Sequence, residues 1–423
     1  MKALVLAGSL PQIELIKNLK NRGYYCILAD YTEHPPAEKY ADKFYRKSTL
    51  DVEAITNIAI SEKVDLLFTV CTDQALNTVA EVSEKLGLPC YINAETGRNV
   101  TNKKYMKQVF SENGIPTAKF VILDRGSYEI PDNFSYPLIV KPVDCNSSKG
   151  VRKVTNKAEL NEALDAAFDF SRTNNAIVEE YIQGQEVSVD IYVHNGKPRI
   201  LCVSNSDKIK DDEKFIIFRS VVPANIADGT YAKIQDAAEK IVKAFNLKEC
   251  PMLIQLLYKD GEIYIIEFSA RTGGGLKFKL INQNSGIDII DNAVNATLSE
   301  GKAVKPEYTN KFIINEFIYA YDGVYKALEG FGELKDKGVI YDYFALKTPG
   351  TEFKGVSSSG DRIAAFTIIA DTYEELNNKY IEAHKSIKVI NSEGKDMMRH
   401  DLTYPVSERK LPGVGVYSDG GLK

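Results

Sequence analysis

The sequence lacks the patterns that mark several large classes of protein. Its six cysteines include no C-x-x-C pair and its four histidines form no H-x-x-x-H spacing, which argues against a zinc site and against histidine-based triad chemistry. No apolar run approaches the ~18 residues that a membrane-spanning helix needs. The apolar stretch 3–7 is too short for the core of a secretion signal. We therefore expect reduced cysteines, no membrane association and a cytosolic location.

An excess of positive charge is also missing. The chain has 53 Lys and Arg against 58 Asp and Glu, a formal net charge of −5, so it has no general attraction for nucleic acid or anionic membranes. A phosphate-bearing ligand would therefore need a local cluster of Lys, Arg and backbone N–H groups. The 423 residues suggest about three domains.

The first 95 residues alternate short apolar strands with amphipathic helices, which predicts an α/β unit with a parallel sheet. Asp30 follows the strand predicted at 25–29, where an acid can bind the ribose of a dinucleotide. However, Gly8-Ser9-Leu10-Pro11 stands where that fold carries G-x-G-x-x-G. We therefore favour a structural sheet over a dinucleotide site.

The pattern changes to α+β over 96–300, where predicted strands outnumber helices, and returns to mixed α/β over 301–403. The polar stretch 204–214 is predicted to be a solvated loop, which is compatible with a mobile lid. The segment 404–423, with two prolines and four glycines, is predicted to be a flexible tail.

Four motifs carry candidate chemistry, and the first two contain lysines. Asn102-Lys103-Lys104 opens a predicted helix; alone, such lysines are usually solvated. Lys141 ends an apolar strand, where a lysine is rarely buried without a partner. The small, polar segment 144–150 after it could direct backbone N–H groups onto phosphate oxygens, although it is not a P-loop. An ordinary strand–turn–strand hairpin is the alternative.

The third motif carries acids. A strand runs into Glu179-Glu180-Tyr181-Ile182, and Glu186 follows shortly after. The backbone there could read an adenine edge while Glu186 accepts hydrogen bonds from sugar hydroxyls. The alternative is a surface bend with acidic side chains.

The fourth motif is the most specific. Asp260-Gly261 between two apolar runs predicts a hairpin. Gln255 and Glu267 would pair across it if the loop has an odd length, such as three residues with a glycine bulge. Glu267 lies among core-like residues, where a carboxylate needs a partner or a metal. With Arg271 and the glycines 273–275, it suggests an oxygen-ligand Mg²⁺ site beside an anion-binding turn. A structural Glu267–Arg271 ion pair is the alternative.

In this order the four motifs resemble those of the ATP-grasp superfamily, in its biotin carboxylase-like branch. The resemblance covers residues 1 to about 400. It implies a Rossmann-like pre-ATP-grasp domain over 1–95, a two-lobed ATP-grasp domain over 96–300 and a small C-terminal α+β domain over 301–403. By position, the resemblance implies ATP binding by Lys103, Lys141, Ser147, Ser148, Lys149, Gly150, Glu179, Glu180, Tyr181, Ile182 and Glu186, metal binding by Gln255, Glu267 and Ser269, and catalytic roles for Lys141 and Arg271.

The resemblance also implies a reaction. ATP and Mg²⁺, with Mn²⁺ as a possible substitute, would convert a carboxylate into an acyl phosphate, which an amine attacks with release of ADP and phosphate. Both partners would be small molecules, and a homodimer is a possible assembly. Two family positions differ: Gln255 replaces a carboxylate and Ser269 replaces Asn, so the metal site has one negative charge fewer.

The branch is less sharply defined than the superfamily. Residues 267–275, Glu-Phe-Ser-Ala-Arg-Thr-Gly-Gly-Gly, are similar to ligases that join amino acids or related carboxylates to amines. Residues 147–151, Ser-Ser-Lys-Gly-Val, resemble phosphoribosylglycinamide synthetases, whose Arg-Phe-Gly-Asp-Pro-Glu segment is absent. A purine-pathway ligase or carboxylase and a nucleotide-binding protein without ligase activity are therefore the alternatives.

Overall fold

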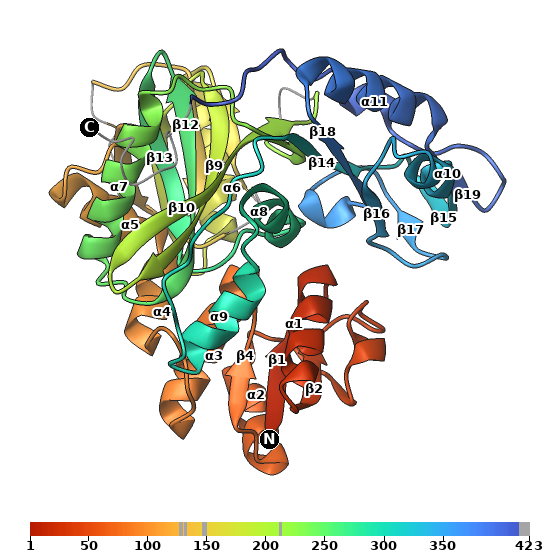
Figure 1. Cartoon of the computed structure of the whole chain (residues 1–423). Helices are drawn as coiled ribbons and strands as arrows, with labels where there is room; N and C mark the ends of the chain where they lie inside the picture. Colours follow the sequence, from red (N-terminus) through yellow and green to blue (C-terminus); the bar gives the residue numbers. More distant parts are fainter. Residues whose placement is uncertain (127–129, 131–132, 146–149, 211–213, 414–423) are drawn as a thin grey trace.

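The computed structural model describes residues 1–126, 130, 133–145, 150–210 and 214–413, without the side chain of Gln74. A small N-terminal sheet lies below a large central sheet, with a smaller C-terminal layer beside the latter (Figure 1). The predicted combination of an α/β and an α+β architecture is confirmed. Ser147, Ser148 and Lys149 lie outside the described residues.

The N-terminal sheet has the strand order β3-β2-β1-β4, and its pairings are parallel, as predicted. Its strands are β1 (Lys2–Leu6), β2 (Tyr25–Asp30), β3 (Lys43–Arg46) and β4 (Leu66–Phe68), and its helices are α1 (Leu10–Asn21), α2 (Val52–Glu62) and α3 (Asp73–Leu86). Consecutive residues of β1 point to opposite faces of the sheet, so Leu4 and Val5 belong to two different hydrophobic clusters. Burial on both faces explains why its strands are continuous apolar runs.

A small antiparallel sheet follows, with the order β5-β8-β6-β7. It consists of β5 (Phe120–Asp124), β6 (Leu138–Pro142), β7 (Arg152–Val154) and β8 (Asn175–Glu180). Helix α6 (Lys157–Phe170) covers it through Leu160, Leu164 and Phe168. Helices α4 (Ala94–Thr101) and α5 (Lys103–Glu112) connect the N-terminal layer to this sheet.

The large sheet has the order β13-β12-β9-β10-β11-β14-β18-β16 and is antiparallel. Its strands are β9 (Gln185–His194), β10 (Lys197–Lys208), β11 (Ile217–Val222), β12 (Cys250–Lys259), β13 (Glu262–Ser269), β14 (Phe312–Ile318), β16 (Asp342–Ala345) and β18 (Ala364–Ala370). Helix α7 (Thr230–Ala244) packs on one face, and α8 (Lys277–Ser285) and α9 (Ile289–Thr297) on the other. Because β11 pairs with β14, this sheet continues across the domain boundary expected near residue 300.

The C-terminal layer adds the sheet β17-β15-β19. Its strands are β15 (Gly323–Glu329), β17 (Glu352–Phe353) and β19 (Lys388–Asn391), with helices α10 (Phe331–Asp336) and α11 (Tyr373–Ser386). Short 3₁₀ turns lie at Glu38–Tyr40, Ser359–Asp361 and His400–Leu402. Helix α11 packs its Leu376, Tyr380 and Ala383 into the same hydrophobic cluster as the buried residues of β18.

The prediction of a loop over 204–214 is wrong for its first part, because residues 204–208 form the end of β10. Polar residues are tolerated inside the sheet because they have partners there. Ser204 accepts a hydrogen bond from Lys277 Nζ at 2.5 Å, and Asn205 Oδ1 accepts one from the Asn225 backbone at 2.7 Å. Residues 211–213 of the predicted lid lie outside the described part of the chain.

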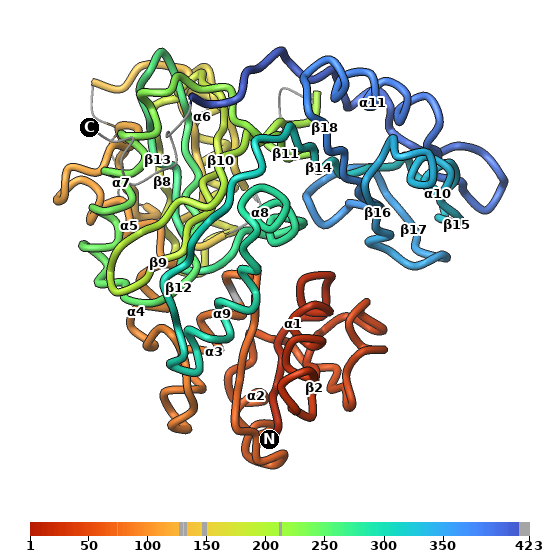
Figure 2. The backbone as a smooth tube through the Cα atoms, in the orientation of Figure 1, coloured from red at the N-terminus to blue at the C-terminus, as the bar shows by residue number. Residues whose placement is uncertain are grey.

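The beginning of the predicted flexible tail is packed against the large sheet (Figure 2). Arg409 is 4% exposed and donates hydrogen bonds to Asn205 Oδ1 at 3.2 Å and to the Pro223 carbonyl at 3.1 Å. The ring of Tyr404 stacks on the buried guanidinium of Arg219 at 5.1 Å. These contacts hold parts of 404–413, 414–423 lie outside the described residues, and the flexibility of the tail stays a prediction.

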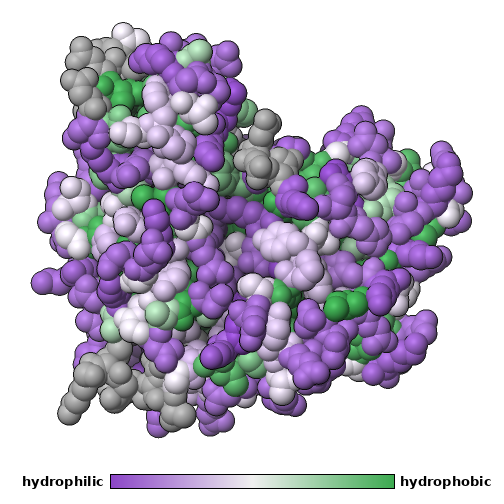
Figure 3. All heavy atoms as spheres, turned by 90° about the horizontal axis from the view of Figure 1, so that it is seen from above, coloured by the Kyte–Doolittle hydropathy of each residue, from purple (hydrophilic) through white to green (hydrophobic). Residues whose placement is uncertain are grey.

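The surface is mainly hydrophilic on the face that Figure 3 shows, where hydrophobic side chains form small separate patches. Small scattered patches are normal for a protein surface and do not by themselves mark an interaction site. Among the described residues, no helix is long and apolar enough to cross a membrane.

Candidate active site

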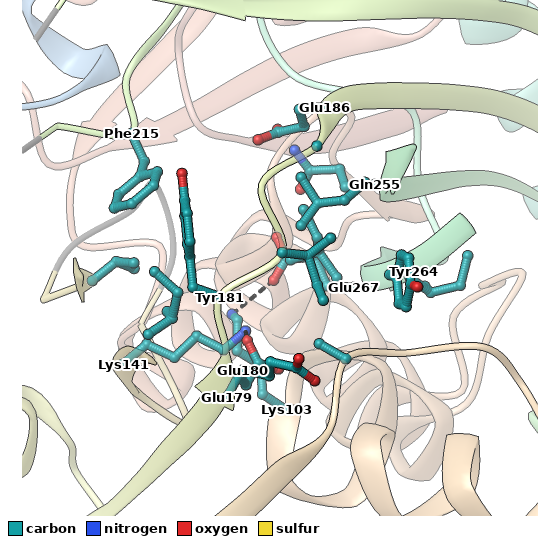
Figure 4. A pocket seen from close by; sticks show the side chains of 18 of the residues that line it. Lys103, Lys141, Glu179, Glu180, Tyr181, Glu186, Phe215, Gln255, Tyr264 and Glu267 are labelled. Atoms are coloured by element: carbon teal, nitrogen blue, oxygen red, sulfur yellow. Dashed lines mark ion pairs between the residues drawn. The ribbon is translucent and has the colours of Figure 1, made fainter. Parts of the chain in front are cut away.

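A pocket lies between the small sheet and the large sheet, and it collects most of the residues predicted to bind a nucleotide or a metal. It is lined by Lys103, Lys141, Glu179, Glu180, Tyr181, Ile182, Glu186, Gln255 and Glu267, together with other residues of α5, β6, β10, β12 and β13. Figure 4 labels these side chains except that of Ile182 and shows them converging on the pocket from the two sheets and from α5. A smaller adjoining cavity contains Ser269 and Arg271 beside Lys103, Gln255 and Glu267.

Two lysines and one glutamate form a buried cluster at one end of the pocket. The Glu179 carboxylate forms two ion pairs. Its Oε1 lies 2.6 Å from Lys107 Nζ, and its Oε2 lies 2.6 Å from Lys141 Nζ. The pairing Ile139↔Glu179 between β6 and β8 places Lys141 on the same face as Glu179. Burial opposes ionisation of Glu179, but the two lysine charges outweigh it and lower its pKa to about 2. The Glu179 side chain therefore belongs to this cationic end, and only its backbone can serve the predicted adenine contact.

Lys107 was missed as a functional candidate, although its spacing carried a signal. Lys103 and Lys107 are four residues apart in α5, so they share one helix face. Lys107 is only 1% exposed, and its ammonium also donates to Thr117 Oγ1 at 2.5 Å. Burial lowers the pKa of Lys107 to about 8, although the nearby Glu179 carboxylate raises it.

The low pKa of Lys107 predicts a pH dependence of nucleotide affinity. The ammonium loses its proton as the pH rises through about 8, and the pocket then loses one positive charge that would favour phosphate. We expect the affinity for a non-hydrolysable ATP analogue, measured by calorimetry, to fall about tenfold between pH 7 and pH 9. Lys107→Met should remove this dependence. A flat profile in the wild type, or an unchanged slope in the variant, would show that Lys107 does not act on the nucleotide.

Gln255 and Glu267 pair directly across the β12–β13 hairpin, the pairing that the sequence analysis made conditional on an odd-length loop. The predicted odd-length loop, however, was wrong. The turn has two residues, Asp260 and Gly261, both with positive φ, as in a type I′ turn. A bulge between Gln255 and Leu256 shifts the register by one residue and restores the shared face.

The oxygen donors around Gln255 and Glu267 suit Mg²⁺, which binds through one or two carboxylates and completes its shell with phosphates and water. Glu267 supplies a carboxylate, Gln255 an amide oxygen and Ser269 a hydroxyl. Lys103 Nζ lies 3.1 Å from Glu267 Oε2. Among the described residues, no group of three or more His, Cys, Asp or Glu forms a metal cage.

Arg271 has a different partner from the one considered in the sequence. The structural alternative paired it with Glu267, but Arg271 binds the carboxylate of Asp73 through Nε at 2.6 Å and through Nη2. Ser269 Oγ also donates to Asp73, at 2.5 Å. Asp73 begins α3 in the N-terminal layer, almost 200 residues earlier. The sequence contained no local signal for this contact, because nothing in it relates the two elements.

The far end of the pocket combines an ion pair with apolar walls. Lys208 Nζ forms an ion pair with Glu186 Oε2 at 2.8 Å. The same ammonium lies 4.9 Å from the centroid of the Phe215 ring. Tyr181 and Ile182 line the pocket near them, with Leu257 from β12. A planar base with an attached sugar could place its ring between these apolar walls and its hydroxyls at Glu186.

Gly150 and Cys145 flank the undescribed part of the predicted phosphate loop. Gly150 has φ +72°, and a Cβ there would approach Pro142 Cδ to 3.0 Å, so this position requires glycine. The carbonyl of Cys145 accepts a hydrogen bond from Lys103 Nζ at 2.8 Å. The start of the loop is thereby joined to the helix α5.

Cys145 provides a direct test of closure over the pocket. Cys145 is one of the residues that line the pocket, so we expect Mg-ATP to slow its labelling by a thiol reagent, measured by peptide mapping. Burial raises the pKa of Cys71 to about 12 and of Cys90 to about 11, so these half-buried thiols should react slowly and serve as internal references. Equal labelling of Cys145 with and without Mg-ATP would contradict a nucleotide in this pocket.

The two sheets and the lysine-rich pocket between them provide the local positive charge that a phosphate-bearing ligand needs. Residues 134–279 match the family model of the ATP-grasp domain. The chain therefore contains a region that matches the ATP-grasp domain.

One similar relative is a D-alanine--D-alanine ligase of Bacillus velezensis, 27% identical over 235 residues, which cover 51% of this chain and 65% of the relative. The chain thus spans less than two thirds of that relative's length.

Solved structures of similar fold include an L-amino acid ligase from Bacillus licheniformis, with a TM-score of 0.77, 20% identity and coverage of 93% of this chain and 99% of that one. A phosphoribosylglycinamide synthetase from Anaerococcus prevotii gives a TM-score of 0.74 at 21% identity, covering 92% of this chain and 99% of that one. At these identities, the likeness establishes the fold alone.

Proposed function

We propose that this protein is an ATP-dependent ligase that converts a carboxylate into an acyl phosphate and joins it to an amine, with release of ADP and phosphate. The observation that carries the proposal is the convergence of Lys103, Lys141 and Glu267 in one pocket, with Arg271 in the adjoining cavity. Phosphoryl transfer requires mainly positioning and charge neutralisation, and these side chains supply both.

The residues at the cationic end would hold the triphosphate. In the described structure Lys103, Lys107 and Lys141 each lie against a carboxylate, so the phosphates would compete with Glu179 and Glu267 for them. Glu267, Gln255 and Ser269 would hold Mg²⁺, which shields the charge of the phosphate oxygens. Glu180 to Ile182 and Glu186 would orient the adenosine.

Arg271 and the glycines 273–275 would receive the substrate carboxylate. The turn is closely packed, since a Cβ at Gly273 would meet Lys277 at 2.7 Å and one at Gly275 would meet Phe317 at 2.7 Å. Glycine thus lets the backbone run near the site without filling it. The charge of Arg271 and the backbone N–H groups would stabilise the oxyanion that forms when the amine attacks.

The substrate class proposed is amino acids or closely related carboxylates. The support is the names of the similar proteins, a D-alanine--D-alanine ligase and an L-amino acid ligase. A sugar-phosphate amine is the second candidate for the acceptor. Its support is the name of another structure of similar fold, a phosphoribosylglycinamide synthetase.

The experiment that tests the proposal is a hydroxamate assay. Hydroxylamine replaces the amine and traps an acyl phosphate, so Mg-ATP with a suitable carboxylate should give a hydroxamate, ADP and phosphate. A panel of amino acids is tested as the carboxylate substrate. In separate reactions without hydroxylamine, amino acids and sugar-phosphate amines are compared as the amine acceptor by the ADP that they release. Formation of AMP and pyrophosphate would contradict the acyl phosphate. Tight ATP binding without ADP formation under any mixture would favour a binding protein without ligase activity.

A further inference from the structure

The carboxylate of Asp73 connects the N-terminal layer to the proposed catalytic side chains. Asp73 is the first residue of α3, yet it accepts hydrogen bonds from Arg271 on both carboxylate oxygens and from Ser269 Oγ. Asp73 also lines the small cavity that contains Lys103, Gln255 and Glu267. One residue outside the ATP-grasp domain thus touches two of the side chains assigned to the reaction.

The contact is buried and charged, which makes its geometry well defined. Only 19% of the Asp73 side chain and 13% of the Arg271 side chain are exposed. Burial opposes ionisation of Asp73, but the charge of Arg271 and its hydrogen bonds outweigh it and lower the pKa of Asp73. A two-point Arg–carboxylate contact also fixes the plane of the guanidinium, which a single hydrogen bond does not.

The contact with Asp73 also determines which N–H groups of Arg271 and which part of the Ser269 hydroxyl can bind a ligand. Arg271 donates Nε and Nη2 to Asp73 and Nη1 to the Thr272 carbonyl, so three of its five N–H groups are engaged in these bonds. Two N–H groups remain to meet a ligand. The hydroxyl hydrogen of Ser269 points to Asp73, which leaves the oxygen lone pairs of Ser269 for a cation.

We propose that Asp73 is a positioning residue, by which the N-terminal sheet holds Arg271 and Ser269 in the orientation that phosphoryl transfer requires. The proposal rests on the proposed ligase function. Asp73 itself does not touch the reacting atoms; it acts through Arg271. Loss of its charge should therefore slow the chemical step and leave nucleotide binding intact.

The test is Asp73→Asn, which keeps the size of the side chain and removes its charge. We expect kcat for hydroxamate formation to fall on the order of a hundredfold, because a small misplacement of a catalytic group is costly. The KM for ATP should stay close to that of the wild type. Asp73→Glu, which keeps the charge but moves it by one methylene, should also lower kcat.

A matched control is available in another ion pair between layers. Arg22 at the end of α1 binds Asp291 of α9 at 2.5 Å, and Asn18 also donates to Asp291 at 2.8 Å. Asp291→Asn weakens this contact, whose residues line neither of the two cavities, and we expect kcat to remain unchanged. If Asp291→Asn lowers kcat as much as Asp73→Asn, the effect is general docking of the layers, and the proposal is overturned.

A second readout separates this proposal from the ligase function. The Nε–H of Arg271 should give a shifted, slowly exchanging signal in ¹⁵N NMR spectra, assigned by its loss in Arg271→Lys. The signal should disappear in Asp73→Asn and persist in Asp291→Asn. If the wild type forms no hydroxamate but this pattern holds, the ligase proposal fails and the positioning contact stands. An Arg271 signal that is unchanged in Asp73→Asn overturns the positioning role.

Discussion

Arg271→Met should reduce hydroxamate formation by about two to three orders of magnitude, the effect typical of losing one group that stabilises developing charge. The affinity for a non-hydrolysable ATP analogue should remain close to that of the wild type, because Arg271 lies outside the main pocket, in the adjoining cavity. Single-turnover measurement of ADP together with calorimetry separates the two effects. This prediction assigns to Arg271 a role in the chemical step rather than in nucleotide binding.

The structure requires a control for this variant. Removing Arg271 leaves the buried Asp73 carboxylate without its ion-pair partner, which can destabilise the fold. The double variant Arg271→Met, Asp73→Asn removes both charges and should recover thermal stability without recovering activity. If the double variant is stable and active, Arg271 serves only the ion pair and the catalytic role is wrong.

Lys141→Met should weaken nucleotide binding by roughly 10- to 100-fold, since a charge-assisted hydrogen bond contributes about 1.5–3 kcal/mol. Methionine is chosen because Lys141 is only 5% exposed, and a smaller side chain would leave a cavity. Glu179 keeps Lys107 as a partner in this variant, so its carboxylate is not left alone. Calorimetry with the ATP analogue measures the loss.

The matched control for Lys141 is Lys104, a more exposed lysine on α5 whose side chain is 38% exposed and lies 4.0 Å from Asp124. Lys104→Met removes the same charge outside the pocket and should leave affinity unchanged. Equal losses in the two variants would mean that total charge, rather than a local phosphate contact, governs binding. Unchanged affinity in a folded Lys141→Met would remove Lys141 from the site.

Local patterns predicted much of the secondary structure because strands and helices follow from periodicity over a few residues. The parallel N-terminal sheet and the β12–β13 hairpin are examples, but the two-residue Asp260-Gly261 turn alone would not pair Gln255 with Glu267. The predicted odd-length loop was wrong: the pairing depends on a bulge, and a bulge leaves little trace in the sequence. The segment 204–208 was misassigned for a related reason: its polar residues have partners in distant elements.

The sequence by itself determined which residue types are present for chemistry: the lysines, the acids and the glycine-rich turn, in an order that resembles that of ATP-grasp proteins. Only the tertiary structure decided how they are paired. It placed Glu179 between Lys107 and Lys141, and it gave Arg271 to Asp73 instead of Glu267. The physical reason is that an ion pair depends on distance in space, and Asp73 and Arg271 meet only when the N-terminal layer packs against the end of β13.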